Sequence, residues 1–176
     1  MEPNIAHLSS FHVAGLTVRT NNRDESTQDR AKIPGLWGRF FSDNVAEKIA
    51  QQLTDAPIVG VYSAYESDAS GAYDVTAGVS VSMPNPDFDN VEIQAGKYMV
   101  FEARGAMPAA VIQAWGTVWA YFEARPQLQR SYATDFESYG GPDEVQIHCV
   151  AGVPKNFLIS TTRFSRNAYR TERRLN

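Results

Sequence analysis

The chain has few of the residues that build disulfide frameworks and metal centres. Among its 176 residues there is one cysteine, Cys149, and there are three scattered histidines, His7, His12 and His148. A single thiol excludes an intramolecular disulfide and any zinc site built on several cysteines. We therefore expect neither a metal nor a cofactor.

Long apolar runs are also missing. No stretch approaches the roughly 18–20 apolar residues that a membrane span needs. The start, MEPNIAHLSS, lacks the basic-then-apolar order of a secretory signal. No phosphate loop or dinucleotide-binding fingerprint is present. These absences predict a cytoplasmic protein that does not interact with a membrane.

Basic charge is scarce except near the end of the chain. The formal net charge is −4, and residues 155–176 hold six basic side chains against Glu172, a balance of +5, so the remainder carries −9. An acidic body repels nucleic acid and attracts cations, so nucleic-acid contact is not expected. The basic end, 153–176, is interpreted as a solvated extension or a segment that folds back on the acidic body. A contact with an acidic partner stays open.

The composition supports a hydrophobic core, because 43% of the residues are hydrophobic and 11% are aromatic. Periodicity predicts the order strand, helix, strand, strand, and then the same order again after the proline-containing loop 83–90. The expected elements are a strand over 11–20, a helix over 34–53, strands over 58–67 and 72–82, a strand over 91–105, a helix over 107–124, and strands over 131–140 and 143–152.

Short matching sequences recur in the two halves in the same order. They pair Ala14-Gly15 with Ala95-Gly96, Trp37 with Trp115, Tyr65 with Phe136, and Asp74 with Glu144. The pattern predicts an α+β fold of two strand–helix–strand–strand modules. Such modules pack about a pseudo-twofold axis with antiparallel sheets, and the place where repeats meet is a common ligand cleft.

The last predicted strand alternates strictly. In EVQIHC, the side chains of Val145, Ile147 and Cys149 share one face, and those of Glu144, Gln146 and His148 share the other. If the helices cover the apolar face, Glu144 lies on the opposite face, open to water or to a cleft, and the alternation alone favours water. Adjacent His148 and Cys149 point apart, which argues against a catalytic dyad.

The segments IPGLW, VYSAYESDASGAYDVTAGV, AGKYMVFEARGAMPAAVIQAWGTVWAYF and YATDFESYGGPDEVQIHCV occur in an order that resembles the GyrI-like small-molecule-binding domains. These are also the effector-binding domains of AraC-type and MerR-type regulators. The likeness is greatest to stand-alone, cassette-encoded members that bind cationic drugs. It covers 8–152, with half-modules at about 8–84 and 90–152, and the extension 153–176 departs from the pattern.

The resemblance implies a ligand cleft with a glutamate at the start of the last strand, which EVQI places at Glu144. It also implies aromatic lining from Trp37, Tyr62, Tyr65, Phe101, Trp115 and Trp119. Helical spacing makes Trp115 and Trp119 equally typical of a core. A carboxylate ringed by aromatics suits a lipophilic cation. The implied function is non-catalytic binding of amphipathic cations by a module without its own DNA reader, with a separate regulator as a candidate partner. A homodimer stays open.

Two other functions are compatible with these residues. Some relatives are hydrolases of reactive electrophiles, and here Glu144 would activate water with help from the hydroxyl of Tyr62 or Tyr65. A protein-interaction role like that of gyrase-inhibiting relatives would use the surface instead. Asp135 and Glu137 share a strand face and could mimic a glycosidase acid pair, but we interpret them as a solvated strand face.

Overall fold

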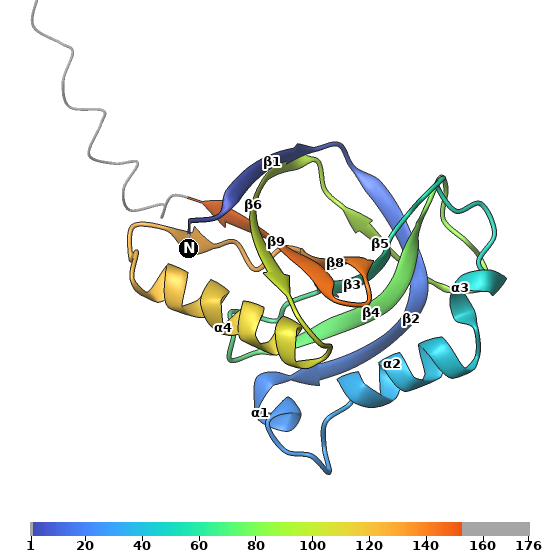
Figure 1. The fold of residues 1–176 in the computed structure, drawn as a ribbon, viewed down its shortest axis with the longest axis horizontal. Helices are drawn as coiled ribbons and strands as arrows, with labels where there is room; N and C mark the ends of the chain where they lie inside the picture. The colour runs from blue at the N-terminus through green and yellow to red at the C-terminus, as the bar shows by residue number, and fades with distance from the viewer. Residues whose placement is uncertain (1, 153–176) are drawn as a thin grey trace, which may run out of the picture.

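The structure is a computed structural model that describes residues 2–152, so the predicted basic extension 153–176 lies outside the described residues. Within them, eight antiparallel strands form one curled sheet in the order β1-β6-β9-β8-β3-β4-β2-β5, and β7 pairs with β9 beside this path (Figure 1). The strands are β1 Asn4–Leu8, β2 Phe11–Asn21, β3 Ile58–Ser63, β4 Ala72–Val81, β5 Asp89–Ile93, β6 Gly96–Arg104, β7 Gln129–Arg130, β8 Asp135–Gly141 and β9 Glu144–Gly152.

The sheet consists of two copies of the predicted module. The first copy is β2–α2–β3–β4 and the second is β6–α4–β8–β9, with α2 at Ile33–Ser42 and α4 at Ala109–Glu123. The copies meet at the centre of the sheet, where β3 pairs with β8 in antiparallel register. This arrangement confirms the predicted α+β fold of two strand–helix–strand–strand units.

Two strands that were not predicted as separate elements link the halves. β1 precedes the first copy in the chain but pairs with β6 of the second copy. β5 precedes the second copy but pairs with β2 of the first. The strand expected over 91–105 is therefore two strands, separated between Ile93 and Gly96. Because each half receives an edge strand from the other half, the relative placement of the modules is fixed by backbone hydrogen bonds.

The helix that the sequence predicts over 34–53 is shorter in the structure. α2 ends at Ser42, and a single turn, α3 at Val45–Lys48, follows after Asn44, whose φ of 49° is left-handed. Asparagine tolerates that conformation better than most residues, and it ends the helical hydrogen-bond ladder here. Pro34 occupies the first turn as predicted. No helix in the part of the chain that the structure describes is both long and apolar enough to cross a bilayer.

The start of α2 is held by a residue from the preceding loop. A short helix, α1 at Asn22–Glu25, occupies the predicted loop, and the Glu25 carboxylate accepts hydrogen bonds from the backbone N–H groups of Lys32 (2.9 Å) and Ile33 (3.3 Å). These N–H groups have no partner inside the helix, and a negative charge at this end also interacts favourably with the helix dipole. Glu25 therefore sets where α2 begins.

The acid at the repeated position has the same structural role in both modules. Asp74 on β4 pairs with Arg19 on β2 at 2.9 Å, and Glu144 on β9 pairs with Arg104 on β6 at 3.1 Å. The Asp74–Glu144 correspondence is therefore confirmed. The correspondence proposed for the first strands is wrong by four residues, because the cross-strand registers match Arg19 to Arg104 and hence Gly15 to Val100.

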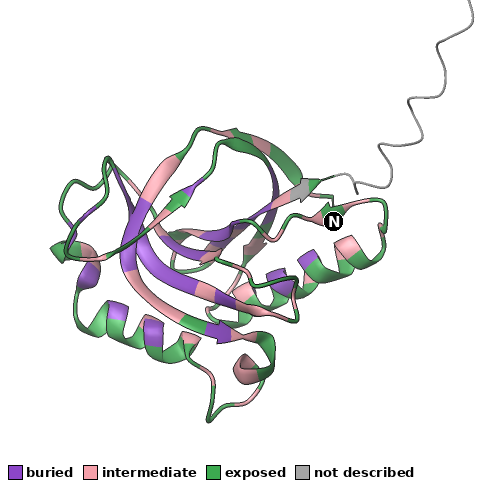
Figure 2. Ribbon diagram, turned by 180° about the vertical axis from the view of Figure 1, so that it is seen from behind, coloured by how far each residue is buried: buried purple, intermediate pink, exposed green. Residues whose placement is uncertain are grey.

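The central strands are covered on both faces. Val59 and Val61 of β3 pack with Phe136 of β8 in one buried cluster, on the face away from α2 and α4. The alternate residues, Gly60 of β3 and Glu137 of β8, face the helices. Figure 2 shows buried residues along the central strands and on the inner sides of both helices. Polar side chains on the helix side of β8 are consequently removed from bulk water.

Candidate ligand-binding site

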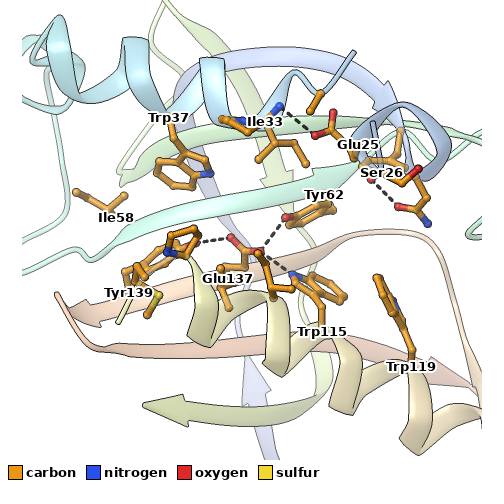
Figure 3. Close-up of a pocket in the computed structure, with 18 of the residues that line it drawn as sticks. Glu25, Ser26, Ile33, Trp37, Ile58, Tyr62, Trp115, Trp119, Glu137 and Tyr139 are labelled. Atoms are coloured by element: carbon orange, nitrogen blue, oxygen red, sulfur yellow. Dashed lines mark hydrogen bonds between the residues drawn. The ribbon is translucent and has the colours of Figure 1, made fainter. Parts of the chain in front are cut away.

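A large cavity lies on the helix side of the central strands, between α2 and α4 (Figure 3). Its volume is about 1290 Å³. Aromatic rings from both modules supply much of its wall, which is therefore mostly apolar. The aromatic lining residues are Trp37, Phe41, Tyr62, Tyr65, Tyr73, Trp115, Trp119 and Tyr139.

The carboxylate of Glu137 is enclosed in the wall of this cavity, and the residue is 2% exposed. Its Oε1 accepts hydrogen bonds from the Tyr62 hydroxyl (2.7 Å) and the Trp115 indole N–H (2.6 Å), and its Oε2 accepts from the Tyr139 hydroxyl (2.6 Å). Burial raises the pKa of Glu137, and the three donors oppose only part of that rise. Hydrogen bonds stabilise the carboxylate, and among residues 2–152 no cationic side chain is paired with it.

The surroundings of Glu137 follow the pseudo-twofold axis. Gly60 lies directly opposite Glu137 in the β3–β8 register. Two residues further along each strand stand Tyr62 and Tyr139, and each tyrosine ring packs edge-to-face on a tryptophan of a helix. Trp115 of α4 lies 5.0 Å from Tyr62, and Trp37 of α2 lies 5.4 Å from Tyr139, between ring centroids. The cavity thus holds two equivalent tryptophan–tyrosine pairs beside the carboxylate of Glu137.

The symmetry is broken at residue 60, where only glycine leaves room for the carboxylate. A Cβ atom at Gly60 would stand 2.8 Å from Oε2 of Glu137 and 3.0 Å from Cζ2 of Trp37. Both distances are shorter than ordinary van der Waals contact. The absence of a side chain in the first module therefore makes space for the acid of the second module.

A second polar cluster lies at one end of the cavity. Arg130 of β7 pairs with Asp135 of β8 at 2.5 Å, and their side chains are 6% and 0% exposed. The Tyr65 hydroxyl donates to Asp135 (3.0 Å) and accepts from Arg130 (3.2 Å). Arg130 and Tyr65 line the cavity. Since Asp135 neutralises Arg130, this cluster adds little net charge.

The charged groups that residues 2–152 place around the cavity leave it negative. Of these residues, Glu137 and Glu25 contribute lining carboxylates, and Arg130, paired with Asp135, contributes the lining cation. The Glu25 oxygens are directed at the backbone of α2. Glu137 is therefore the carboxylate best placed to face a ligand.

The structure brings together five of the seven residues predicted for the site. Trp37, Tyr62, Tyr65, Trp115 and Trp119 all line the cavity. Trp115 is nearly buried, and Trp119, one turn further along α4, is 51% exposed. Trp115 therefore satisfies both expectations for the α4 tryptophans. Its indole packs in the core, and its N–H donates to Glu137 in the cavity wall.

The placement of Phe101 and Glu144 in the cavity is wrong. Phe101 is buried beneath α4, where its ring packs against Tyr121 at 5.3 Å. Glu144 starts β9 on the face away from the helices, and its side chain is 33% exposed beside Arg104. It lines a separate hollow of about 330 Å³. The large cavity is on the helix-covered face of the sheet, so a residue on the other face does not reach it.

The enclosed carboxylate of Glu137 is not among the site residues that the sequence predicts. The sequence favours a solvated strand face for Asp135 and Glu137, and both are buried. A tyrosine common to both modules could have identified Glu137. When Tyr62 of the first module is aligned with Tyr139 of the second, Gly60 becomes the counterpart of Glu137. The alignment of Tyr65 with Phe136 concealed this correspondence. Nothing else in the strand distinguishes a buried acid from a solvated one.

The fold and this aromatic cavity define a class of small-molecule-binding domain. The chain belongs to the GyrI-like small molecule binding domain family, whose model matches residues 1–146. It is 29% identical over 160 residues to YobU of Bacillus subtilis (strain 168), which is named as a candidate transcriptional regulator, covering 86% of this chain and 97% of YobU.

Two solved structures are similar over 86% of this chain. The integron cassette protein VCH_CASS2, from the mobile metagenome of Vibrio cholerae, is 36% identical, with a TM-score of 0.75 and 96% of its chain covered. The protein SAV2435, solved bound to tetraphenylphosphonium, is 26% identical, with a TM-score of 0.72 and 94% of its chain covered.

Proposed function

We propose that the cavity binds lipophilic aromatic cations and that Glu137 is their counter-charge. The observation that carries this proposal is the enclosed Glu137 carboxylate, which has three neutral hydrogen-bond donors and no cationic partner among residues 2–152. A cation entering the cavity would supply the opposite charge that this carboxylate lacks.

The lining supports affinity for such a ligand in two further ways. Faces of tryptophan and tyrosine rings attract cations by about 0.5–2 kcal/mol each, depending on desolvation. The apolar wall would also be covered when an aryl group enters, at roughly 25 cal/mol per Å² removed from water. Neither contribution requires a fixed hydrogen-bond geometry. We therefore expect the cavity to accept cations of different shapes.

The SAV2435 structure supports the ligand class, because its bound tetraphenylphosphonium is a lipophilic cation with four aryl groups. The family supports small-molecule binding in general. Action together with a separate transcription regulator remains a prediction, which follows from the resemblance to the effector-binding domains of regulators.

The test is a calorimetric titration with two ions of matched shape and opposite charge. Tetraphenylphosphonium is expected to bind with a dissociation constant in the micromolar range, about −8 kcal/mol. Tetraphenylborate is expected to bind at least about a hundredfold more weakly, because it faces Glu137 with the same sign of charge. Equal affinity for the two ions would show that apolar surface alone attracts ligands, and the proposal would be rejected.

Cation affinity is expected to fall as the pH is lowered through the raised pKa of Glu137. Tetraphenylphosphonium has no titratable group, and only ionised Glu137 provides a counter-charge, so the proton and the ligand compete. Titrations over a series of pH values measure the effect, and Glu137→Gln serves as the pH-independent control. A wild-type affinity that stays constant from neutral pH to below the ordinary pKa of glutamate would contradict the assignment.

The unliganded protein should show the opposite trend in stability. Between the ordinary and the raised pKa of Glu137, the unfolded chain has released a proton that the folded chain still holds. The contribution of this residue to the free energy of unfolding therefore decreases as the pH rises through that window. Cation binding would recover part of this loss at neutral pH.

The two alternative functions have weaker support. A hydrolase in which Glu144 acts with Tyr62 or Tyr65 needs these side chains in one cavity. Tyr62 and Tyr65 line the large cavity, and Glu144 lies outside it. Glu137 is close to Tyr62, but three hydrogen-bond donors already use most of its acceptor positions, and the Tyr62 hydroxyl is one of these donors, which leaves little room for a water on the carboxylate. The gyrase-inhibitor-like protein-interaction role remains a prediction, and the basic segment considered for it lies outside the described residues.

A further inference from the structure

The two ends of the cavity differ although the modules are related. In the β3–β8 register Ile58 faces Tyr139, and Tyr62 faces Asp135. Ile58 therefore holds, on β3, the position that Asp135 holds on β8, two residues before Gly60 and Glu137 respectively. One end of the cavity is consequently apolar, lined by Ile58 and Phe41, and the other end carries the cluster of Arg130, Asp135 and Tyr65. We call these the apolar end and the polar end.

Arg130 is the hydrogen-bond donor of the polar end. Its Nη2 donates to Asp135 and to the Tyr65 hydroxyl. Its guanidinium carbon lies 4.7 Å from the ring centroid of Tyr132 and 5.2 Å from that of Trp115. The side chain is thus held by an ion pair and by ring faces, and it keeps a nearly fixed position. An arginine that is fixed in advance loses little entropy when it donates to a ligand.

Part of the guanidinium remains available for a ligand. Arginine has five N–H donors, and the two hydrogen bonds described use only those of Nη2. Within residues 2–152, Nη1 makes no hydrogen bond. Nη1 is not among the fully enclosed unpaired atoms, and Arg130 lines the cavity, so we infer that Nη1 is the donor that a bound molecule reaches. Nε also has no hydrogen-bond partner among these residues, but it is fully enclosed.

Trp115 sets the spacing between this donor and the carboxylate. Its indole N–H bonds Glu137, and its ring faces Arg130. The two charged side chains therefore contact the same indole, one at its edge and one over its face. A ligand whose positive centre lies against Glu137 would extend only a few bonds before it reaches Arg130.

We propose that the preferred ligands are aromatic cations with a neutral hydrogen-bond acceptor, such as a ketone, amide or ether, a few bonds from the positive centre. Their aryl groups occupy the apolar end, and the acceptor receives a hydrogen bond from Arg130. This inference rests on the proposed function. We specify a neutral acceptor because a ligand carboxylate would be repelled by the two carboxylates of Glu137 and Asp135 and attracted by the one guanidinium of Arg130.

The test compares two triphenylphosphonium cations, one with a pentyl arm and one with an acetylpropyl arm of the same chain length. The wild-type chain is expected to bind the ketone about fivefold more tightly, since a hydrogen bond from a charged donor exceeds the cost of removing a ketone from water. In Arg130→Lys, which keeps the positive charge beside Asp135, this preference should disappear.

The matched control is Arg125→Lys. Arg125 pairs with Glu2 and lies over Tyr121, outside the cavity, so this variant should keep the wild-type preference. If the wild-type chain binds both cations equally, or if the preference survives in Arg130→Lys, the inference is overturned while the proposed function stands. If neither cation binds, the proposed function itself fails. The wild-type comparison decides even if Arg130→Lys does not fold.

Discussion

Replacing Glu137 by glutamine is expected to weaken tetraphenylphosphonium binding by about ten- to a hundredfold, which is about 1.4–2.8 kcal/mol. Among residues 2–152, Glu137 is the carboxylate of the cavity wall without a cationic or backbone partner, and the substitution removes this charge while the aromatic wall stays intact. Charge interactions are stronger in a partly desolvated cavity than in water, so they should supply a large share of the affinity. Isothermal titration calorimetry at neutral pH measures the change.

The folded state should tolerate Glu137→Gln. The amide oxygen can still accept from Tyr62 and Trp115, and the amide N–H₂ can donate to the Tyr139 hydroxyl. Since burial penalises the charged form of Glu137, the free energy of unfolding should stay constant or rise. The matched control is Glu144→Gln, the same change at the acid first expected in the site. An equal loss of affinity in both variants would reject Glu137 as the counter-charge.

Arg130→Met is expected to lower the free energy of unfolding by about 3–5 kcal/mol. Asp135 is fully buried, and Arg130 is its ion-pair partner. Removing the guanidinium leaves the Asp135 carboxylate buried without its cation. Among the hydrogen bonds of residues 2–152, the one from the Tyr65 hydroxyl then remains. Urea unfolding of the unliganded chain at neutral pH measures the loss.

Arg104→Met is the control for this change. Arg104 pairs with Glu144 on the face of the sheet away from α2 and α4, and their side chains are 75% and 33% exposed. Exposed ion pairs contribute about 0–1 kcal/mol, so this variant should remain close to the wild type. Losses of similar size in the two variants would show that the enclosure of Asp135 has no special cost. That result would also weaken the view of Arg130 as a fixed donor.

The part of the site that could be predicted from sequence is the part carried by helices and by the family likeness. The sequence matches Trp37 with Trp115 across the repeat, and the structure packs each of them on a tyrosine that donates a hydrogen bond to Glu137. Phe101 could not be distinguished from a lining residue, because its segment is apolar and half of such a strand faces a core. The basic residue Arg130, on the two-residue strand β7, gave no sequence pattern at all.

The choice between Glu137 and Glu144 shows why the rest could not be predicted. Both acids stand on alternating strands, and alternation fixes only which residues share a face. Which face is covered depends on where α2 and α4 pack and on what closes the second face. Those contacts join residues far apart in the chain, such as Trp37 with Tyr139 and Trp115 with Glu137.

The sequence alone determined the two-module α+β order, the repeated acid at Asp74 and Glu144, and a chain rich in aromatic and acidic residues. These depend on local periodicity and composition, which act within a few residues. Only the tertiary structure decided that the solvated-looking Glu137 is the enclosed carboxylate and that Glu144 is a cross-strand partner of Arg104. The reason is that burial is set by the packing of both modules on the β3–β8 pair, where Gly60 makes room for Glu137.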